Sequence, residues 1–234
     1  MNTDNKNNCL KLKTKFAFTL AEVLITLGII GVVAALTIPM LISDIQMKHF
    51  KAGYKKIYSE LNSVSKSLID EYGELYADVC PTQFDDVCLA KLFASKMKVD
   101  KFCNSSTVTQ GCQHKFKFLD GKSTYTIGNA TYNADANWPG FVTGTGYSLT
   151  FRFHSTSYVS TVDGKIAWGW MTIDVNGEKA PNTVGKDIYY VRLLDFGQIA
   201  PMVYHEESIS IEDLKQDCYH GSGVYCSKLF LLEK

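Results

Sequence analysis

Three groups of side chains in this sequence have types and spacings that could do chemistry. Glu22 is the only charged residue in the apolar stretch 18–42. A carboxylate placed in lipid is costly unless it is paired, so its presence in such a stretch indicates a functional role. The second group is a set of cysteines, and the third is formed by Asp174, Asn176 and Asp187, which carry oxygen ligands in a segment rich in turn-forming residues.

The apolar stretch 18–42 is long enough, as a helix, to cross the hydrocarbon core of a bilayer of about 30 Å. The lysines that precede it outnumber the one acid, Asp4, which predicts a cytoplasmic N-terminus and export of the remainder. These lysines are Lys6, Lys11, Lys13 and Lys15. A secretory signal peptide is disfavoured because the stretch is too long and no A-x-A pattern follows it. A plain membrane anchor would leave Glu22 unexplained.

Six of the seven cysteines follow the apolar stretch, and the seventh, Cys9, precedes it. An even number of cysteines on the exported side predicts disulfides. The sequence alone does not fix the pairing, but the spacings suggest three local loops: Cys80 with Cys88, Cys103 with Cys112, and Cys218 with Cys226. A zinc site is disfavoured because no pair has C-x-x-C spacing.

Segment 174–187 has two competing interpretations. In the first interpretation, Asp174, Asn176 and Asp187 together hold Ca²⁺, which takes hard oxygen ligands from flexible loops. Alternatively, these side chains accept hydrogen bonds from backbone donors in a tight connection. The spacing differs from that of an EF-hand, so the structural interpretation is favoured and no cofactor is expected, with Ca²⁺ as the open alternative.

No set of catalytic residues is evident in the sequence. The five histidines occur singly, without an H-E-x-x-H or G-x-S-x-G pattern, and no phosphate-binding glycine loop follows a strand. They are His49, His114, His154, His205 and His220. The formal net charge is zero, which argues against a dedicated nucleic-acid binder and gives no support to a role in DNA uptake. We expect a protein that is not an enzyme.

Residues 17–22, Ala-Phe-Thr-Leu-Ala-Glu, follow a short basic leader and resemble the class III signal of type IV pilins and type II secretion pseudopilins. The resemblance implies that a prepilin peptidase cuts between Ala17 and Phe18, removes Cys9 with the leader, and methylates the new amine. Glu22 and Pro39 lie where the family has its acid and its proline, and both are implied to act in assembly. The family usually has Gly at the position of Ala17. This motif covers only about 25 residues.

A second, softer resemblance lies further along the chain. The pattern D-x-N-G…P-N…G-x-D within 174–187, followed by an aromatic strand and Gly197-Gln-Ile-Ala-Pro201, is similar to loops of pilin and pseudopilin head domains. The family resemblance implies a structural subunit, with a minor pilin of a type IV pilus-like filament favoured. The alternatives are a type II secretion pseudopilin and a membrane-anchored periplasmic binding domain that never polymerises.

The implied partners are other pilin or pseudopilin subunits in a homo- or heteropolymer, the prepilin peptidase, an inner-membrane assembly platform and membrane lipid. The implied location is the inner membrane, crossed once with the N-terminus in the cytoplasm, and then a cell-surface or periplasmic filament. Genomic neighbours would separate a pilus from a secretion system, because the sequence itself shows neither filament length nor cargo.

The expected fold is α+β and pilin-like, with a long N-terminal α-helix packed on an antiparallel β-sheet head domain. We expect a leader at 1–17, a membrane-spanning or filament-core half of the helix at 18–42, an amphipathic half at 43–73, and the β-rich head at 74–234. An apolar stripe at helical spacing predicts that one helix continues past Pro39 and packs on the sheet, ending near Gly73. The stripe comprises Phe50, Tyr54, Ile57, Leu61, Val64, Leu68 and Tyr72.

Within the head, turn residues and alternating apolar residues predict the remaining elements. Asp85 is expected to cap a helix, and Asp120-Gly121 to turn a hairpin. The predicted elements are a helix at 85–98, hairpin strands at 115–119 and 123–127, a long loop at 128–146, and strands at 147–154, 158–162, 166–175 and 188–194, with surface loops at 74–83 and 103–112. Short turns between antiparallel neighbours predict a meander.

Overall fold

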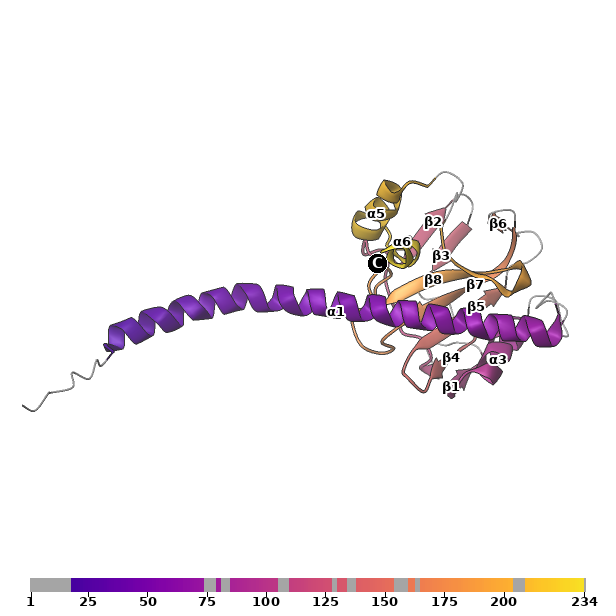
Figure 1. The fold of residues 1–234 in the computed structure, drawn as a ribbon, viewed down its shortest axis with the longest axis horizontal. Coiled ribbons are helices and arrows are strands. Elements are labelled where there is room, and N and C mark those ends of the chain that lie inside the picture. The colour runs from indigo at the N-terminus through magenta and orange to yellow at the C-terminus, as the bar shows by residue number, and fades with distance from the viewer. Residues whose placement is uncertain are drawn as a thin grey trace, which may run out of the picture. The chain divides into compact units, whose positions relative to one another are not determined.

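The computed structural model describes residues 18–73, 79–80, 85–104, 110–127, 130–133, 138–153, 160–162, 165–203 and 209–233. Figure 1 shows a long helix, an antiparallel sheet and shorter helices. The chain divides into two compact units, 1–45 and 46–234.

Helix α1 (Leu20–Tyr72) has 53 residues and contains Pro39 without a break, so the prediction of one continuous helix is confirmed. In its first half, the apolar side chains from Leu20 to Ile45 are largely exposed. The helix ends where predicted: Gly73 has a φ of +97°, which favours glycine, and its N–H donates to the carbonyl oxygen of Ile69 at 2.9 Å.

Among the described residues, the main sheet of the second unit has seven strands, and every neighbouring pair is antiparallel. Its order is β1-β4-β5-β7-β8-β9, and β6 also pairs with β7. The strands are β1 (Val99–Cys103), β4 (Gly140–Thr143), β5 (Ser148–Phe153), β6 (Ser160–Val162), β7 (Lys165–Asp174), β8 (Ile188–Leu194) and β9 (Ile199–Pro201). A separate two-stranded sheet joins β2 (Thr124–Ile127) to β3 (Ala130–Asn133).

The core lies between the second half of α1 and one face of the main sheet, which Figure 1 shows behind the helix. From α1, the buried apolar side chains follow the predicted stripe. From the strands, alternate residues point to the same face because side chains alternate across a strand. The buried set includes Tyr54, Ile57, Leu61, Leu68, Leu149, Phe151, Phe153, Met171, Ile173, Tyr189, Val191 and Leu193. Packing of the amphipathic half of the helix on an antiparallel sheet is therefore confirmed.

Two predictions for the head are wrong. Segment 115–119 does not pair with 123–127: β2 pairs with β3, and Lys117 instead exchanges backbone hydrogen bonds with Asn182 and Val184. Segment 128–146 is not a long loop, because β3 and β4 lie within it. Gly140 is typical of a loop in sequence, yet it lies in β4, paired with Thr150. A Cβ there would come within 2.1 Å of the Leu149 carbonyl oxygen, which explains why this strand position is a glycine.

Several short elements match or extend the predictions. Helix α3 (Asp86–Lys96) begins after Asp85, whose Oδ1 accepts from the N–H groups of Val87 at 2.9 Å and Cys88 at 3.0 Å, as predicted. Helices α5 (Ile211–His220) and α6 (Cys226–Leu232) were not predicted. The signal for α5 is a capping box, in which the side chains of Ser210 and Asp213 each accept from the other's backbone N–H.

Candidate functional site

The first turn of α1 gives Glu22 a local partner that the sequence interpretation missed. Thr19 is the N-cap of the helix: its N–H and its hydroxyl donate to Glu22 Oε2 at 2.9 and 2.8 Å. In return, the Glu22 N–H donates to Thr19 Oγ1 at 3.2 Å. The signal was present in the sequence as Thr-x-x-Glu before an apolar run, which is the pattern of a capping box. Glu22 therefore fixes the start of the helix in the isolated chain.

The residues at the predicted cleavage point lie just before this turn. Phe18 is 85% exposed, and Ala17 lies outside the described residues. One described helix, α1, is long and apolar enough to cross a membrane by length and composition, and the apolar window lies near the N-terminus. Exposed apolar surface on this scale indicates contact with lipid or with other proteins. The residues of this surface are Leu20, Val23, Leu24, Ile25, Leu27, Ile29, Ile30, Val32, Val33, Leu36, Ile38, Met40, Leu41 and Ile42.

The middle of this stretch combines Pro39 with small residues. Nothing lies within 4 Å of the position where a Cβ would stand on Gly28 or Gly31. These two positions leave room for another backbone to approach the helix closely. Because Pro39 has no N–H, it removes one hydrogen bond of the helix, although the helix continues past it. A role of Pro39 in unwinding the helix during assembly stays a prediction.

The segment after β7 brings two buried carboxylates into a tight connection. Oδ1 of Asp174 accepts from the N–H groups of Asn176 at 3.0 Å and Gly177 at 2.8 Å. Asp187 accepts from the N–H of Asn182 at 2.8 Å and of Thr183 at 2.7 Å, through its two oxygens. These bonds match the structural interpretation of the segment, in which side-chain oxygens satisfy backbone donors.

Burial sets the protonation of these carboxylates. Desolvation raises the pKa of Asp174 to about 7, although the N–H groups of Asn176 and Gly177 oppose this shift. Burial also raises the pKa of Asp187, again against hydrogen bonds from the backbone. Two buried amide oxygens here, Asn176 Oδ1 and Asn182 Oδ1, have no hydrogen-bond partner.

Those unpartnered oxygens are the observation that fits a cation. Together with the carboxylates of Asp174 and Asp187, the amide oxygens of Asn176 and Asn182 are the hard oxygen ligands that Ca²⁺ prefers. In the described part of the chain, however, no three His, Cys, Asp or Glu side chains gather in a way that could hold a metal ion. Binding of Ca²⁺ therefore stays a proposal beside the structural interpretation.

We expect the stability of the Asp174→Asn variant, relative to that of the wild-type protein, to increase as the pH rises from about 5 to about 8. The pKa of Asp174 is about 7 in the folded protein, whereas its ordinary value is 3.8. Between these values the folded state binds a proton that the unfolded state has lost. The contribution of Asp174 to the stability of the wild-type protein therefore falls as the pH rises. The variant still offers an oxygen to the two N–H groups but carries no charge. Denaturant unfolding of both proteins at several pH values without metal measures the difference.

Binding of Ca²⁺ to Asp174 would instead favour the stability of the wild-type protein over that of the variant. If Asp174 ligates Ca²⁺, added Ca²⁺ should stabilise the wild-type protein at about pH 8 by mass action and leave Asp174→Asn unchanged. A difference between the two proteins that is independent of both pH and Ca²⁺ would contradict both interpretations of this carboxylate.

The six cysteines after the apolar stretch pair within the three short loops that their spacing suggested. The bridges join Cys80 to Cys88, Cys103 to Cys112 and Cys218 to Cys226. The last bridge connects α5 to α6. The carboxylate of Asp217 stabilises the turn between these helices by accepting from the N–H groups of Ser222 at 2.9 Å and Tyr225 at 2.8 Å.

The C-terminal segment is held to α1 through Glu233, a contact that no sequence pattern signalled. Lys51 Nζ donates to Glu233 Oε2 at 2.7 Å, and Lys55 Nζ donates to the Glu233 carbonyl oxygen at 2.5 Å. Partial burial pushes the pKa of Glu233 up, but the hydrogen bond and charge of Lys51 outweigh it and the pKa is lowered. Lys51 also lies 4.2 Å from the ring centroid of Phe230, a cation–π contact.

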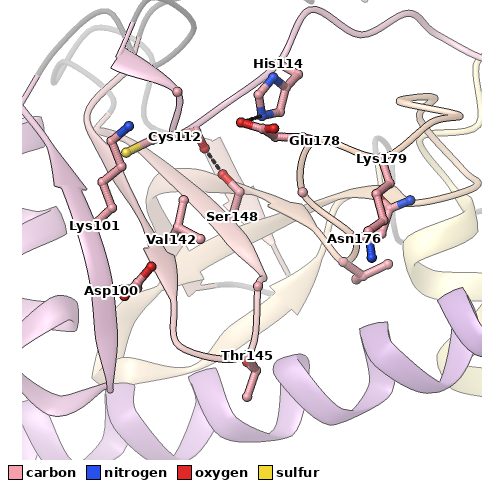
Figure 2. A pocket seen from close by; sticks show the side chains of 14 residues that line it. Asp100, Lys101, Cys112, His114, Val142, Thr145, Ser148, Asn176, Glu178 and Lys179 are labelled. Carbon is pink, nitrogen blue, oxygen red and sulfur yellow. Dashed lines mark hydrogen bonds and ion pairs between the residues drawn. The ribbon is translucent and has the colours of Figure 1, made fainter.

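A groove of about 610 Å³ lies between β1, the residues Gly111, Cys112 and His114, and the turn after β7. Figure 2 shows His114 beside Glu178, with His114 Nε2 3.8 Å from Glu178 Oε1. The Ser148 hydroxyl donates to the Cys112 carbonyl oxygen, so it already has an acceptor inside the chain. The lining is mixed in charge and includes Asp100, Lys101, His114, Asn176, Glu178 and Lys179.

These features together define an α+β protein with a long apolar N-terminal helix and an antiparallel sheet, stabilised by three local disulfides. No family model, no curated protein and no solved structure matches this chain. Its function therefore has to be inferred from its own residues.

Proposed function

We propose that this protein is a minor subunit of a type IV pilus-like filament, processed by a prepilin peptidase and assembled through its N-terminal helix. It acts as a structural subunit and not as a catalyst. The observation that carries the proposal is that one helix combines two different halves. The first half is apolar and exposed and follows the sequence Phe-Thr-Leu-Ala-Glu at its start, and the second half packs on the head.

The apolar half of α1 supports this proposal because its exposed side chains require an apolar environment. In the precursor, lipid covers it, with the lysine-rich leader in the cytoplasm and the head outside. In the filament, the apolar halves of neighbouring subunits cover one another, and Gly28 and Gly31 leave room for close packing. The partners are then other pilin-like subunits, the peptidase and an inner-membrane assembly platform.

The disulfides support export of the head. Three bridges within 74–234 are stable in an oxidising compartment and are rare in the cytosol. Bridges that close such short loops stabilise a domain by roughly 2–3 kcal/mol each in the chain-entropy model. This suits a head that works on the outer side of the membrane.

The mature protein is expected to begin with a methylated Phe18. Mass spectrometry of the N-terminal peptide from the membrane fraction checks this, with a host lacking the prepilin peptidase as the control. In that host the peptide should retain Ala17 and the leader. A mature chain that starts beyond residue 42 would instead identify a cleaved secretory signal and would refute the proposal.

Two alternatives differ from this proposal in measurable ways. A type II secretion pseudopilin would be processed identically but would act with secretion genes in place of a retraction motor. A membrane-anchored binding domain would keep its leader and never enter sheared filaments. The groove that includes His114 and Glu178 is the feature that favours a binding role, and it fits either a filament subunit or an anchored domain.

A further inference from the structure

The groove between β1 and the turn after β7 is lined by charges of both signs. Asp100 and Lys101 lie on β1, and both are exposed. Glu178 and Lys179 lie in the turn, and both are exposed. With the other described residues, Asp100, Lys101 and Lys179 form no ion pair. Glu178 Oε1 is 3.8 Å from His114 Nε2, and its side chain is 79% exposed, so this contact leaves the carboxylate accessible.

Both sides of the groove are held by hydrogen bonds within the chain. Next to β1, the Ser148 hydroxyl donates to the Cys112 carbonyl oxygen. In the turn after β7, Asp174 Oδ1 accepts from the N–H groups of Asn176 and Gly177. Binding sites for small molecules are usually formed in advance in this way, because binding then has to order few groups.

The strand order sets the distance between the two sides. In the sheet, β1 and β7 are separated by β4 and β5. Neighbouring strands lie about 4.8 Å apart, so the backbones of the two sides are about 14 Å apart. Lys101 lines the groove from one side and Glu178 from the other, and Figure 2 shows the hydrogen bond between Ser148 and Cys112 between them. A single small ion cannot contact both sides, whereas a chain of three residues, which spans up to about 10 Å, can reach the side chains of both.

The balance of charge limits the chemistry of the ligand. Besides His114, the described lining contains two acids and two lysines, so a simple anion or cation would be repelled by part of it. A neutral sugar would leave all four charges without a partner. A short peptide with free ends matches the lining, because it carries a carboxylate at one end and an ammonium at the other.

The side chains of the turn indicate the direction of such a peptide. Figure 2 shows the Glu178 carboxylate pointing toward His114 and the Lys179 side chain pointing the other way. Glu178 is therefore the charge that this side presents to β1, and it would take the ammonium. The carboxylate then lies at β1, where Lys101 is the cation.

We propose that this groove binds short peptides with free ends, with the peptide carboxylate at Lys101 and the peptide ammonium at Glu178. The site lies entirely within the second compact unit. It does not depend on filament formation, because every group that it uses belongs to one copy of the chain.

The test titrates three peptides into the full chain in detergent, with EDTA present so that no divalent cation competes. The probes are triglycine, N-acetyl-triglycine, which lacks the ammonium, and triglycine amide, which lacks the carboxylate. Triglycine should bind, and each blocked peptide should bind at least about fivefold more weakly, because it loses one charged hydrogen bond. Isothermal titration calorimetry measures the three dissociation constants.

Two substitutions assign the ends of the peptide. Lys101→Gln should weaken the binding of triglycine about fivefold and leave the binding of triglycine amide unchanged. Glu178→Gln should weaken triglycine to the same extent and leave N-acetyl-triglycine unchanged. Both residues are exposed, so both variants should fold. Lys91→Gln is the control, because Lys91 is exposed on α3 and does not line the groove, and it should bind as the wild-type protein does.

Three results would overturn the proposal. The first is no detectable binding of triglycine to the wild-type protein, and the second is equal binding of all three peptides. The third is a variant that binds triglycine as the wild-type protein does, or that weakens triglycine and its matching blocked peptide equally. The titration requires no filament, so its failure is distinct from a failure of the proposed function.

Discussion

Leu61→Ala should destabilise the head by about 2–5 kcal/mol, because it removes a fully buried side chain from the contact between α1 and the sheet. The loss combines the transfer free energy of the missing atoms with the cost of the cavity that remains. Typical domains are stable by about 5–15 kcal/mol, so one such substitution removes a large share of the total. Denaturant unfolding of the full chain in detergent, followed by near-ultraviolet circular dichroism, measures the change.

Ser67→Ala is the matched control on the same helix. Ser67 is exposed on the outer face, and its replacement should change stability by less than about 0.5 kcal/mol. Equal effects of the two substitutions would mean that the second half of α1 does not pack on the sheet in solution. The expected contrast also separates head stability from membrane insertion, since both residues lie beyond the apolar half of the helix.

The sequence predicted those elements whose side chains follow one clear period. Strand β8 was predicted with its observed bounds, and β5 was recognised because Leu149, Phe151 and Phe153 alternate toward the core. The continuous helix α1 was likewise predicted, because its apolar stripe keeps helical spacing past Pro39. In these elements local pattern and tertiary burial agree.

The errors occurred where a tertiary contact decides the structure. Gly140 is typical of a loop in sequence, but the close approach of the β5 backbone explains a glycine within a strand. Asp120-Gly121 does form a turn, with Gly121 N–H donating to the Phe118 carbonyl oxygen at 2.9 Å. Residues 115–119, however, form no strand, and β2 after the turn pairs with β3. Partners distant in sequence are not visible in a local pattern.

For the candidate sites, too, local spacing could be predicted from the sequence, whereas contacts between distant residues could not. The three disulfide loops could be suggested from spacing, because short loops bring cysteines together without knowledge of the fold. The contact of Glu233 with Lys51 and Lys55 could not, since it joins the two ends of the second unit. The hydrogen bonds between Glu22 and Thr19 match the Thr-x-x-Glu pattern of a capping box, which is visible in the sequence. The sequence interpretation of Glu22 rested on the cost of a charge in lipid and missed this pattern.

The hydrogen bonds between Thr19 and Glu22 leave two roles open for the Glu22 carboxylate: capping of α1 and pairing with a neighbouring subunit. If the carboxylate pairs with the new amine of a neighbouring subunit, then Glu22→Ala leaves a buried charge uncompensated at a cost of about 3–5 kcal/mol per contact. We expect this variant to insert and to be cleaved normally, but to enter filaments at least about a hundredfold less well, since about 1.4 kcal/mol is tenfold in an equilibrium. Glu22→Asp should be intermediate because its shorter side chain loses reach.

A capping role alone would give a smaller and different result. Loss of an N-cap interaction costs about 0.5–2 kcal/mol. Glu22→Gln retains an oxygen that can accept from the Thr19 N–H and hydroxyl, but it has no charge. Thr19→Ala removes the capping hydroxyl and leaves the Glu22 charge in place.

The two roles therefore predict opposite rankings. Charge pairing between subunits predicts that Glu22→Gln fails to assemble as Glu22→Ala does, whereas Thr19→Ala still assembles. Capping predicts that Glu22→Gln assembles and that Thr19→Ala shares the defect. The measurement is sheared-filament yield against mature protein retained in the membrane, with methylation of Phe18 checked by mass spectrometry. We expect the first ranking, because a neutral amide cannot compensate the amine that cleavage creates only four residues away. Normal assembly of Glu22→Gln would show that the charge of Glu22 has no part in filament formation.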